Sequence, residues 1–325
     1  TRLARVGRRR SPSRSPLPPR HGLDAARLRL PVTGPWATLR EHLVERLPRV
    51  TPERIDEMLR EGRIVGLDGP AAPDAPFVPG QVLWFHRDLP DEVAVPFDIP
   101  VLYRDENVLV VDKPHFLATI PRGSHVLQTA LVRLRHELGL PSLSPAHRLD
   151  RATAGVLLFV VRPELRGAYQ TLFRDRRVRK TYDAIAPVEP GLALPRTVRS
   201  RIVKERGVIA AYTAPGPPNA QTHVELLERR GELGHYRLVP ATGRTHQLRL
   251  HMAELGVPIV HDDLYPVVRE IAPGDFSRPL QLLASALEFT DPVTGRLRHF
   301  TSNRTLALWD SGPLPLRRAN GTYGK

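Results

Sequence analysis

A single carboxylate stands where this chain could do chemistry. Asp150 lies between Arg148 and Arg151, and an apolar run from Val156 to Val161 follows the segment Arg151 to Gly155. This pattern predicts a strand, a turn and a second strand, with Asp150 at the corner. Such a corner presents a side chain from a rigid scaffold, so the carboxylate could act as a nucleophile. On these residues alone, the commoner role of such an Asp is to shape the turn.

Two later stretches favour the chemical role. Lys180-Thr181-Tyr182 lies thirty residues downstream, and Thr242 to Arg249 lies further on. Tyr182 offers a ring face for a base and a hydroxyl for proton transfer. Arg244 sits just before a predicted helix N-terminus, where the helix dipole disfavours a cation. A carboxylate partner would remove that cost, and a nearby cation would in turn keep a nucleophilic carboxylate ionised.

The three stretches together resemble the RluA family of RNA pseudouridine synthases. The family patterns are HRLD-x-x-T-S-G, K-x-Y and T-G-R-T/S-H-Q-L/I-R-x-H, and this chain has His147 to Asp150, Lys180 to Tyr182 and Thr242 to His251 in the same order. The resemblance covers roughly residues 101 to 300. It implies an isomerase that breaks the bond from ribose to N1 of uracil and rejoins ribose at C5, with neither cofactor nor metal.

The resemblance also implies a role for each matched residue. Asp150 would be the nucleophile, Tyr182 the second catalytic residue and Arg244 the ion-pair partner of Asp150. Four residues are expected to bind substrate. They are Arg148, which could replace a flipped nucleotide in the stack, Leu248, which would form an apolar floor, His147, which could also only brace the turn, and Lys180. Ordinary helix packing stays open for Leu248.

Charge and composition indicate the kind of partner. The 325 residues carry a net charge of +14 and no cysteine. Such an excess of Arg favours a polyanion, nucleic acid first. The resemblance implies that this partner is ribosomal or transfer RNA. The longest apolar runs are too short for a membrane span. A cytoplasmic, monomeric protein without a membrane partner is expected.

Composition shifts divide the chain into five parts. Residues 1–22 hold seven Arg and no acid, and a disordered basic tail is expected over 1–30. Residues 31–87 resemble the small RNA-binding module that precedes the catalytic domain in this family, although Leu67-Asp68-Gly69 stands where Asn-Gly is usual. Both RNA binding and packing are open roles for it. An acidic linker over 88–100, a catalytic domain over 101–310 and a tail over 311–325 complete the division.

Periodicity predicts an α+β fold. In the small module, Leu39 to Leu47 and the segment after Thr51-Pro52 have the apolar spacing of two short helices. In the catalytic domain, helices are expected over 129–138, from Pro163 and over 245–255, and a hairpin is expected across 228–234. Helices and strands do not alternate regularly, so a mixed, largely antiparallel sheet is preferred to a parallel one.

Two rival classes of protein fit the sequence less well than the enzyme. A non-catalytic RNA-binding or ribosome-assembly protein on the same scaffold would be expected to lack at least one of Asp150, Tyr182 and Arg244, and all three are present. A binder of anionic membranes would need a basic amphipathic helix with exposed aromatic residues, and none stands out. Which RNA is modified, and at which uridine, stays open at this point.

Overall fold

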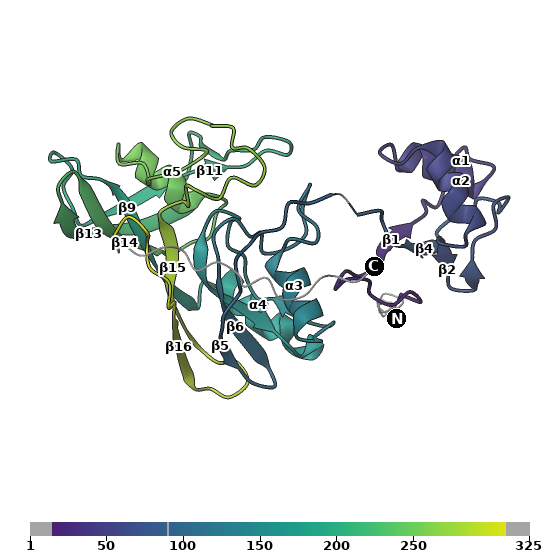
Figure 1. Ribbon diagram of the computed structural model, residues 1–325, viewed down its shortest axis with the longest axis horizontal. Coiled ribbons are helices and arrows are strands. Elements are labelled where there is room, and N and C mark those ends of the chain that lie inside the picture. Colours follow the sequence, from purple (N-terminus) through teal and green to yellow (C-terminus); the bar gives the residue numbers. More distant parts are fainter. Residues whose placement is uncertain (1–14, 90, 310–325) are drawn as a thin grey trace, which may run out of the picture. The chain divides into compact units, whose positions relative to one another are not determined.

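The computed structural model describes residues 15–89 and 91–309, which form two compact units divided between Leu89 and Pro90 (Figure 1). Each unit has its own hydrophobic core. No helix in the described part of the chain is long and apolar enough to cross a membrane.

The first unit is a small α+β module with a four-stranded sheet in the order β1-β4-β2-β3. Its elements are β1 (Ala26–Arg29), α1 (Leu39–Arg46), α2 (Pro52–Arg60), β2 (Val65–Gly66), β3 (Gly69–Pro70) and β4 (Val82–Phe85). The helix start expected at Thr51 is confirmed, because its side chain accepts a hydrogen bond from Arg54 N and Pro52 is the first helical residue. Thr38 caps α1 through a reciprocal capping box with Glu41.

Two expected boundaries are wrong. The predicted tail over 1–30 is ordered at its end, because β1 pairs with β4 and Leu30 is buried in the core of the first unit. Residues 1–14 and residues 310–325, which include the predicted C-terminal tail, lie outside the described residues. The predicted linker over 88–100 belongs in large part to the second unit, where Val95, Phe97 and Ile99 are buried in its core. Their alternation, with every second residue apolar, was the overlooked indication of burial.

The second unit is built on a mixed sheet with the strand order β10-β13-β14-β9-β15-β8-β6-β5, to which β7 and β16 add at β8 and β15. Its strands are β5 (Val101–Arg104), β6 (Val108–Lys113), β7 (Ser144–Pro145), β8 (Ala154–Val160), β9 (Val178–Pro187), β10 (Arg196–Ser200), β13 (Ala220–Arg230), β14 (Leu233–Pro240), β15 (Leu282–Thr290) and β16 (Leu297–Thr301), with a separate pair of β11 (Ile202–Val203) and β12 (Tyr212–Thr213). All pairings between the strands of the second unit are antiparallel except that of β15 with β8, and the isolated bridge between Ala118 and Thr129 is also parallel. The predicted α+β class with a largely antiparallel sheet is confirmed.

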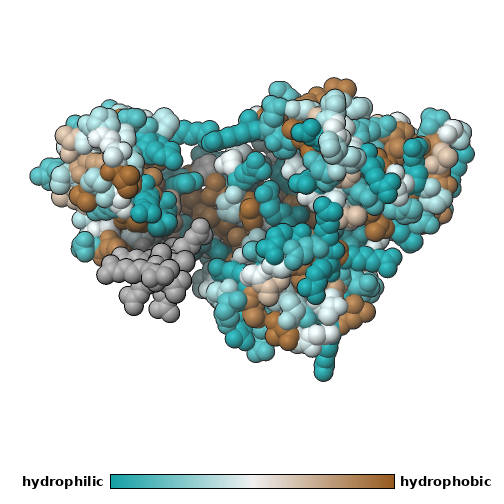
Figure 2. Space-filling model, turned by 180° about the vertical axis from the view of Figure 1, so that it is seen from behind, coloured by the Kyte–Doolittle hydropathy of each residue, from teal (hydrophilic) through white to brown (hydrophobic). Residues whose placement is uncertain are grey.

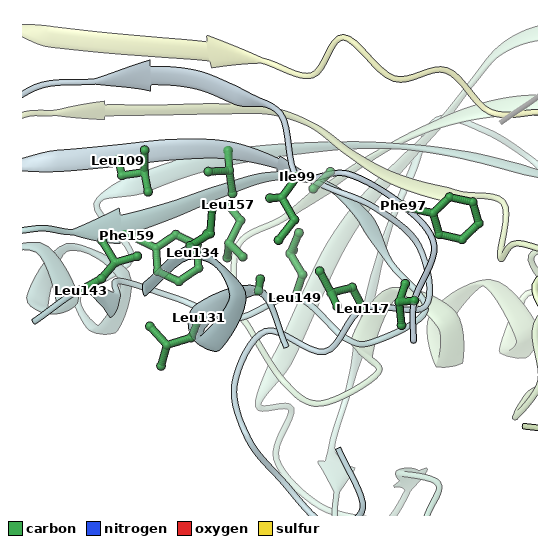
Figure 3. Packing of buried hydrophobic residues seen from close by; sticks show 14 of the residues in the cluster. Phe97, Ile99, Leu109, Leu117, Leu131, Leu134, Leu143, Leu149, Leu157 and Phe159 are labelled. Atoms are coloured by element: carbon green, nitrogen blue, oxygen red, sulfur yellow. The ribbon is translucent and has the colours of Figure 1, made fainter. Parts of the chain in front are cut away.

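Helices cover both faces of the sheet around β6 and β8. On one face α3 (Ala130–Glu137) packs on Leu109, Leu157 and their neighbours; on the other, α4 (Arg166–Arg174), which follows the 3-10 turn η1 (Pro163–Leu165), packs on alternate residues of the same strands. A strand buried on both faces needs apolar residues throughout, which is why β8 reads as one apolar run. Figure 3 shows the first of these clusters, in which Leu149, the neighbour of Asp150, lies.

Strand β15 joins the two halves of the sheet. It pairs with β9 along most of its length, with β8 at Leu283 and Ala284, and with β16 at its end. The approach to β8 is close, since a Cβ on Gly155 would lie 2.2 Å from Ala284 O. Gly155 also has a φ of +114°, a conformation that side chains rarely adopt, so this position requires glycine.

The remaining elements agree with the sequence-based prediction except at the first motif, His147 to Asp150. Helix α3, helix α4 and α5 (Gln247–Glu254) lie where helices were expected, and the hairpin of β13 and β14 has a tighter turn than predicted. The strand predicted before the turn at Asp150 is wrong: residues 146–150 are irregular. Seen from the face shown in Figure 2, hydrophilic residues predominate and hydrophobic ones form small, separated groups.

Candidate active site

All seven residues singled out in the sequence line one cavity of about 1370 Å³ in the second unit. The lining is strongly basic. It includes nine Lys and Arg side chains but only two carboxylates, Asp150 and Asp263. The cations are Arg122, Arg148, Arg151, Arg174, Arg176, Lys180, Lys204, Arg244 and Arg249. In the described part of the chain only Arg174 and Arg249 of these nine form ion pairs. The cavity therefore suits a polyanion.

Side-chain hydrogen bonds hold the backbone on the N-terminal side of Asp150. The Thr119 hydroxyl donates to Leu149 O at 2.7 Å and accepts from Leu149 N at 3.1 Å. One side chain thus satisfies both backbone groups of the residue before Asp150, which replaces the strand pairing that the sequence pattern predicted. On the other side, Thr153 N donates to Asp150 O at 3.1 Å and closes the turn.

The residues after Asp150 are held by the end of β6. The fully buried Lys113 donates to Arg151 O at 3.4 Å, and the Nδ1 of His115 lies 2.7 Å from Ala152 O. Burial lowers the pKa of His115 to about 3, so the ring is neutral and Nδ1 carries the hydrogen that it donates. Burial, followed by the charge of Arg304, also holds the pKa of Lys113 well below its usual value. The turn that presents Asp150 is therefore fastened at both ends.

The Asp150 carboxylate itself is open to the cavity. Within residues 15–89 and 91–309 it accepts no hydrogen bond and forms no ion pair. Its charge nevertheless acts on its surroundings. Burial first, and then the negative charge of Asp150, raise the pKa of Tyr182 well above its ordinary value. The Tyr182 phenol is therefore protonated at neutral pH and can donate a hydrogen bond.

Strand β9 places Lys180 and Tyr182 two residues apart, and thus on the same face of the sheet, toward the cavity. The ammonium of Lys180 donates to Thr242 O at 2.9 Å, which joins the second motif to the third. Burial, followed by the charge of Arg176, lowers the pKa of Lys180 to about 8. Tyr182 packs against two of the hydrophobic core clusters of the second unit.

His147 and Arg148, the first two residues of the first motif, have different surroundings. His147 accepts a hydrogen bond from Leu158 N at 3.2 Å and stacks on Phe173 with ring centroids 4.4 Å apart. Burial lowers its pKa to about 3, so it is neutral, and its contacts brace the turn. Arg148 is exposed at the cavity wall.

The third motif is organised by Gln247. Its amide oxygen accepts from Arg244 N at 3.0 Å and from the Thr242 hydroxyl at 2.7 Å, and its amide nitrogen donates to Gln221 O at 2.9 Å. This network fixes the loop before α5. Leu248, next in the helix, is buried in a core cluster and also lines the cavity, so both roles considered for it are consistent with its position.

The expected ion pair between Arg244 and Asp150 is not formed. The Arg244 side chain is exposed, and its Nε donates to Asn219 O at 3.1 Å. The buried cation of this motif is Arg249, which donates to Asp262 at 2.8 Å and also pairs with Asp263. Burial acts to lower the pKa of Arg249, but these carboxylates, and to a lesser degree Asp150, hold it above its usual value.

Sequence reasoning missed residues that hold the turn at Asp150 and others that line the cavity. Lys113, His115 and Thr119 were not singled out, although the Lys-Pro at the end of an apolar strand indicated that this segment was unusual. The loop between β11 and β12 also lines the cavity through Lys204, Gly207, Val208 and Ile209, and its sequence carries no recognisable pattern. No cluster of three or more metal-ligating side chains occurs within the described ranges.

Comparisons with known proteins agree with this geometry. The sequence profile described as RNA pseudouridylate synthase matches residues 107–254, which include all three motifs. The chain is 33% identical to an uncharacterized RNA pseudouridine synthase of Synechocystis over 64% of this chain and 72% of that protein. It is 30% identical to the ribosomal large subunit pseudouridine synthase D of Xylella fastidiosa, over 77% and 80% of the two chains.

A further relative and two solved structures support the same grouping. The dual-specificity RNA pseudouridine synthase RluA of Haemophilus ducreyi is 30% identical over 63% of this chain and 92% of that protein. The fold is similar to that of human RNA pseudouridylate synthase domain containing 1, with a TM-score of 0.54, 23% identity and coverage of 71% and 94%. For human RNA pseudouridylate synthase domain containing 4 the values are 0.50, 23%, 63% and 88%.

Proposed function

Because the chain belongs to the RluA family of RNA pseudouridine synthases and is an isomerase of that family, we propose that it modifies specific uridines of ribosomal or transfer RNA in the cytoplasm, as a monomer, with Asp150 as the nucleophile. Support for the RNA class comes from the relatives, whose names refer to the large ribosomal subunit or to dual specificity. Support for Asp150 comes from its place in the basic cavity, with an open carboxylate on a fastened turn.

The reaction needs few protein groups. The bond between C1′ of ribose and N1 of uracil breaks, a bond between C1′ and C5 forms, C5 loses a proton and N1 gains one. Uracil can leave as a stabilised anion, so the demand on the protein is a carboxylate that attacks or stabilises the reacting centre. Asp150 meets that demand because its oxygens face the cavity without competing partners among the described residues.

The neighbours of Asp150 have separate roles in this scheme. Tyr182 offers its ring face to the base and its protonated hydroxyl for a hydrogen bond or proton transfer. Leu248 forms part of the apolar floor. Arg148, exposed at the wall, fills the space that the flipped nucleotide leaves in the stack. Lys180 binds a phosphate or a base edge, and His147 braces the turn.

Arg249 is a better candidate than Arg244 for the cation that supports the nucleophile electrostatically. Its guanidinium is buried and held in place by Asp262 and Asp263, so the Arg249 side chain loses little conformational freedom when substrate binds. Among the causes that hold its pKa high is the charge of Asp150. Arg244, exposed at the same cavity, is placed to contact the phosphate backbone instead.

The observation that carries this proposal is the meeting of all three motifs at one basic cavity. The test is to map pseudouridines across all cellular RNA with and without the gene. Loss of one or more sites in ribosomal or transfer RNA is expected, with return of those sites on expression of the parent but not of Asp150→Asn. Unchanged maps of these two RNA classes would contradict the substrate assignment.

A further inference from the structure

The loop between β11 and β12 presents two aliphatic side chains to solvent at the wall of the cavity. Val208 is 43% exposed and Ile209 is 65% exposed, and both line the cavity that contains Asp150. Exposed aliphatic residues are common on protein surfaces when they are scattered. Two in succession beside a basic cavity suggest a contact with the ligand of that cavity.

The loop is fastened to the third motif at its end. The Tyr265 hydroxyl donates to Ala211 O at 2.8 Å and accepts from Ala211 N at 2.8 Å. The Nδ1 of His246 lies 3.1 Å from the same hydroxyl, whose single hydrogen is already used, so Nδ1 must be the donor. A buried phenol therefore ties the loop to the residue that precedes α5. Figure 1 shows β11 beside this helix, where Ile202 and Leu250 share a core cluster.

A second contact shapes the tip of the loop. The Lys204 ammonium donates to Glu205 O at 2.9 Å and to Val208 O, so it closes the loop on itself. The side chains of Val208 and Ile209 remain outside this ring of contacts. Arg206, between them and Lys204 in the chain, is exposed and forms no ion pair within the described residues. The loop thus offers a small apolar surface next to a cation.

This combination matches the chemistry of an unpaired nucleotide. A base that has left its stack exposes an apolar face, and its phosphate carries the negative charge that a nearby arginine can neutralise. Apolar side chains placed against bases are a recurrent way to hold unstacked nucleic acid. The cavity takes the target uridine, so a surface continuous with it meets the adjoining nucleotides.

We propose that the loop 204–211 is a nucleotide-binding finger, in which Val208 and Ile209 contact the face of an unpaired base that adjoins the target uridine and Arg206 lies at its phosphate. This inference rests on the proposed function for its substrate. It adds a determinant of site choice that is separate from the chemistry at Asp150.

The test compares two double variants with matched exposure. Val208→Ser with Ile209→Ser removes the apolar surface of the finger. Val293→Ser with Leu297→Ser, on the turn side of the β15–β16 hairpin, removes two side chains that are 47% and 69% exposed and do not line the cavity. Binding is measured on the RNA identified by mapping, and on copies of it that carry an abasic ribose at each position next to the target uridine.

For the finger variant we expect binding to the intact RNA to weaken about tenfold, since the two aliphatic groups that would be buried against the base are removed. On the RNA with the abasic ribose at the contacted position, the parent and the finger variant should bind equally. The hairpin variant should match the parent on every RNA. Single-turnover rates at saturating enzyme should be the same within about twofold for all three proteins, because the chemistry is not altered.

Three results would overturn the finger: unchanged affinity of the finger variant, an equal weakening in the hairpin variant, or a weakening that persists on every abasic RNA. A failure of the proposed function appears differently. If the mapped sites lie in another RNA class, the same measurements are made on that RNA and still decide the role of the loop.

Discussion

The two units of the molecule differ in how they use charge. Residues 15–89 contain ten arginines and ten acidic residues, and in the first unit Arg54 and Arg63 both pair with Asp88 while Arg40 pairs with Asp56. In the second unit, the cavity has nine cations against two carboxylates, and seven of those cations form no ion pair in the described part of the chain.

The difference shows that net charge alone does not locate an RNA-binding surface. Residues 15–89 are rich in arginine, yet their arginines are balanced by acids, so this part of the first unit contributes little long-range attraction for a polyanion. The second unit concentrates unbalanced cations around two carboxylates, of which Asp263 pairs with Arg249 and Asp150 forms no ion pair within the described residues. The packing role considered for residues 31–87 therefore fits the charge balance of this part of the chain better than RNA binding does.

The largest expected effect separates chemistry from binding within the second unit. Asp150→Asn should reduce pseudouridine formation to background, because an amide cannot replace the nucleophilic carboxylate. RNA affinity should stay within about tenfold, since the surrounding cations remain. Tritium release from RNA labelled at C5 of uridine measures the first quantity and a filter-binding titration the second. Near-normal release would remove Asp150 from its proposed role.

The next effect compares the two arginines of the third motif. Arg249→Lys should lower the single-turnover rate about tenfold, because lysine keeps the charge but lacks the planar fork that Asp262 and Asp263 hold in place. Arg244→Lys should leave this rate unchanged and change only RNA affinity. Lysine is the better substitution, since Arg249→Ala would leave the buried Asp262 unpaired at a cost of about 3–5 kcal/mol. A loss of single-turnover rate in the Arg244 variant alone would make Arg244 the cation that supports Asp150.

A third experiment compares the units directly. Arg122→Gln with Arg176→Gln, two exposed cavity arginines, should reduce the slope of log affinity against log salt by roughly 0.7 for each phosphate that the variant no longer neutralises. Arg46→Gln with Arg49→Gln, two exposed arginines of the first unit, should leave the slope unchanged. Equal changes in both double variants would mean that the first unit also holds RNA.

A smaller effect is expected from pH. With a pKa of about 8, Lys180 is charged below that value and neutral above it, so RNA affinity should fall two- to threefold as pH rises from about 7 to about 9. Lys180→Met should bind more weakly at the lower pH and lose this dependence. Titration of a short, unstructured RNA at constant salt provides the measurement, and an identical pH profile in the variant would assign the titration to another group.

The smallest effect lies in the first unit. The ion pairs with Arg54 and then Arg63 lower the pKa of Asp88, so their contribution to stability is present above the ordinary pKa of an Asp and is lost as pH falls below about 4. The side chain is half exposed, so Asp88→Asn should cost no more than about 1 kcal/mol at neutral pH. Denaturant unfolding followed by tryptophan fluorescence measures it, and pseudouridine formation should not change.

The sequence predicted which residues meet but not every contact that they make. Asp150, Tyr182 and Leu248 are far apart in the chain, and their motifs were sufficient to place them at one cavity. The rotamer of Arg244 was not predictable, because a long exposed side chain chooses among partners, such as Asn219 O, that only the folded chain brings near. The same holds for Thr119, whose hydrogen bonds to Leu149 span thirty residues without a periodic pattern.

The position of β15 has a consequence for the order in which the enzyme matures during synthesis. Its residues, 282–290, are made after all the strands between which it inserts, β8 and β9, and only β16 follows it among the described strands. Until β15 leaves the ribosome, these two strands present unpaired edges toward the gap between the halves of the sheet. Chains elongate at about 5–20 residues per second, so this interval lasts several seconds. The nascent chain therefore carries all three motifs well before it can assemble them, and a chaperone that shields the edges of β8 and β9 would act in that interval.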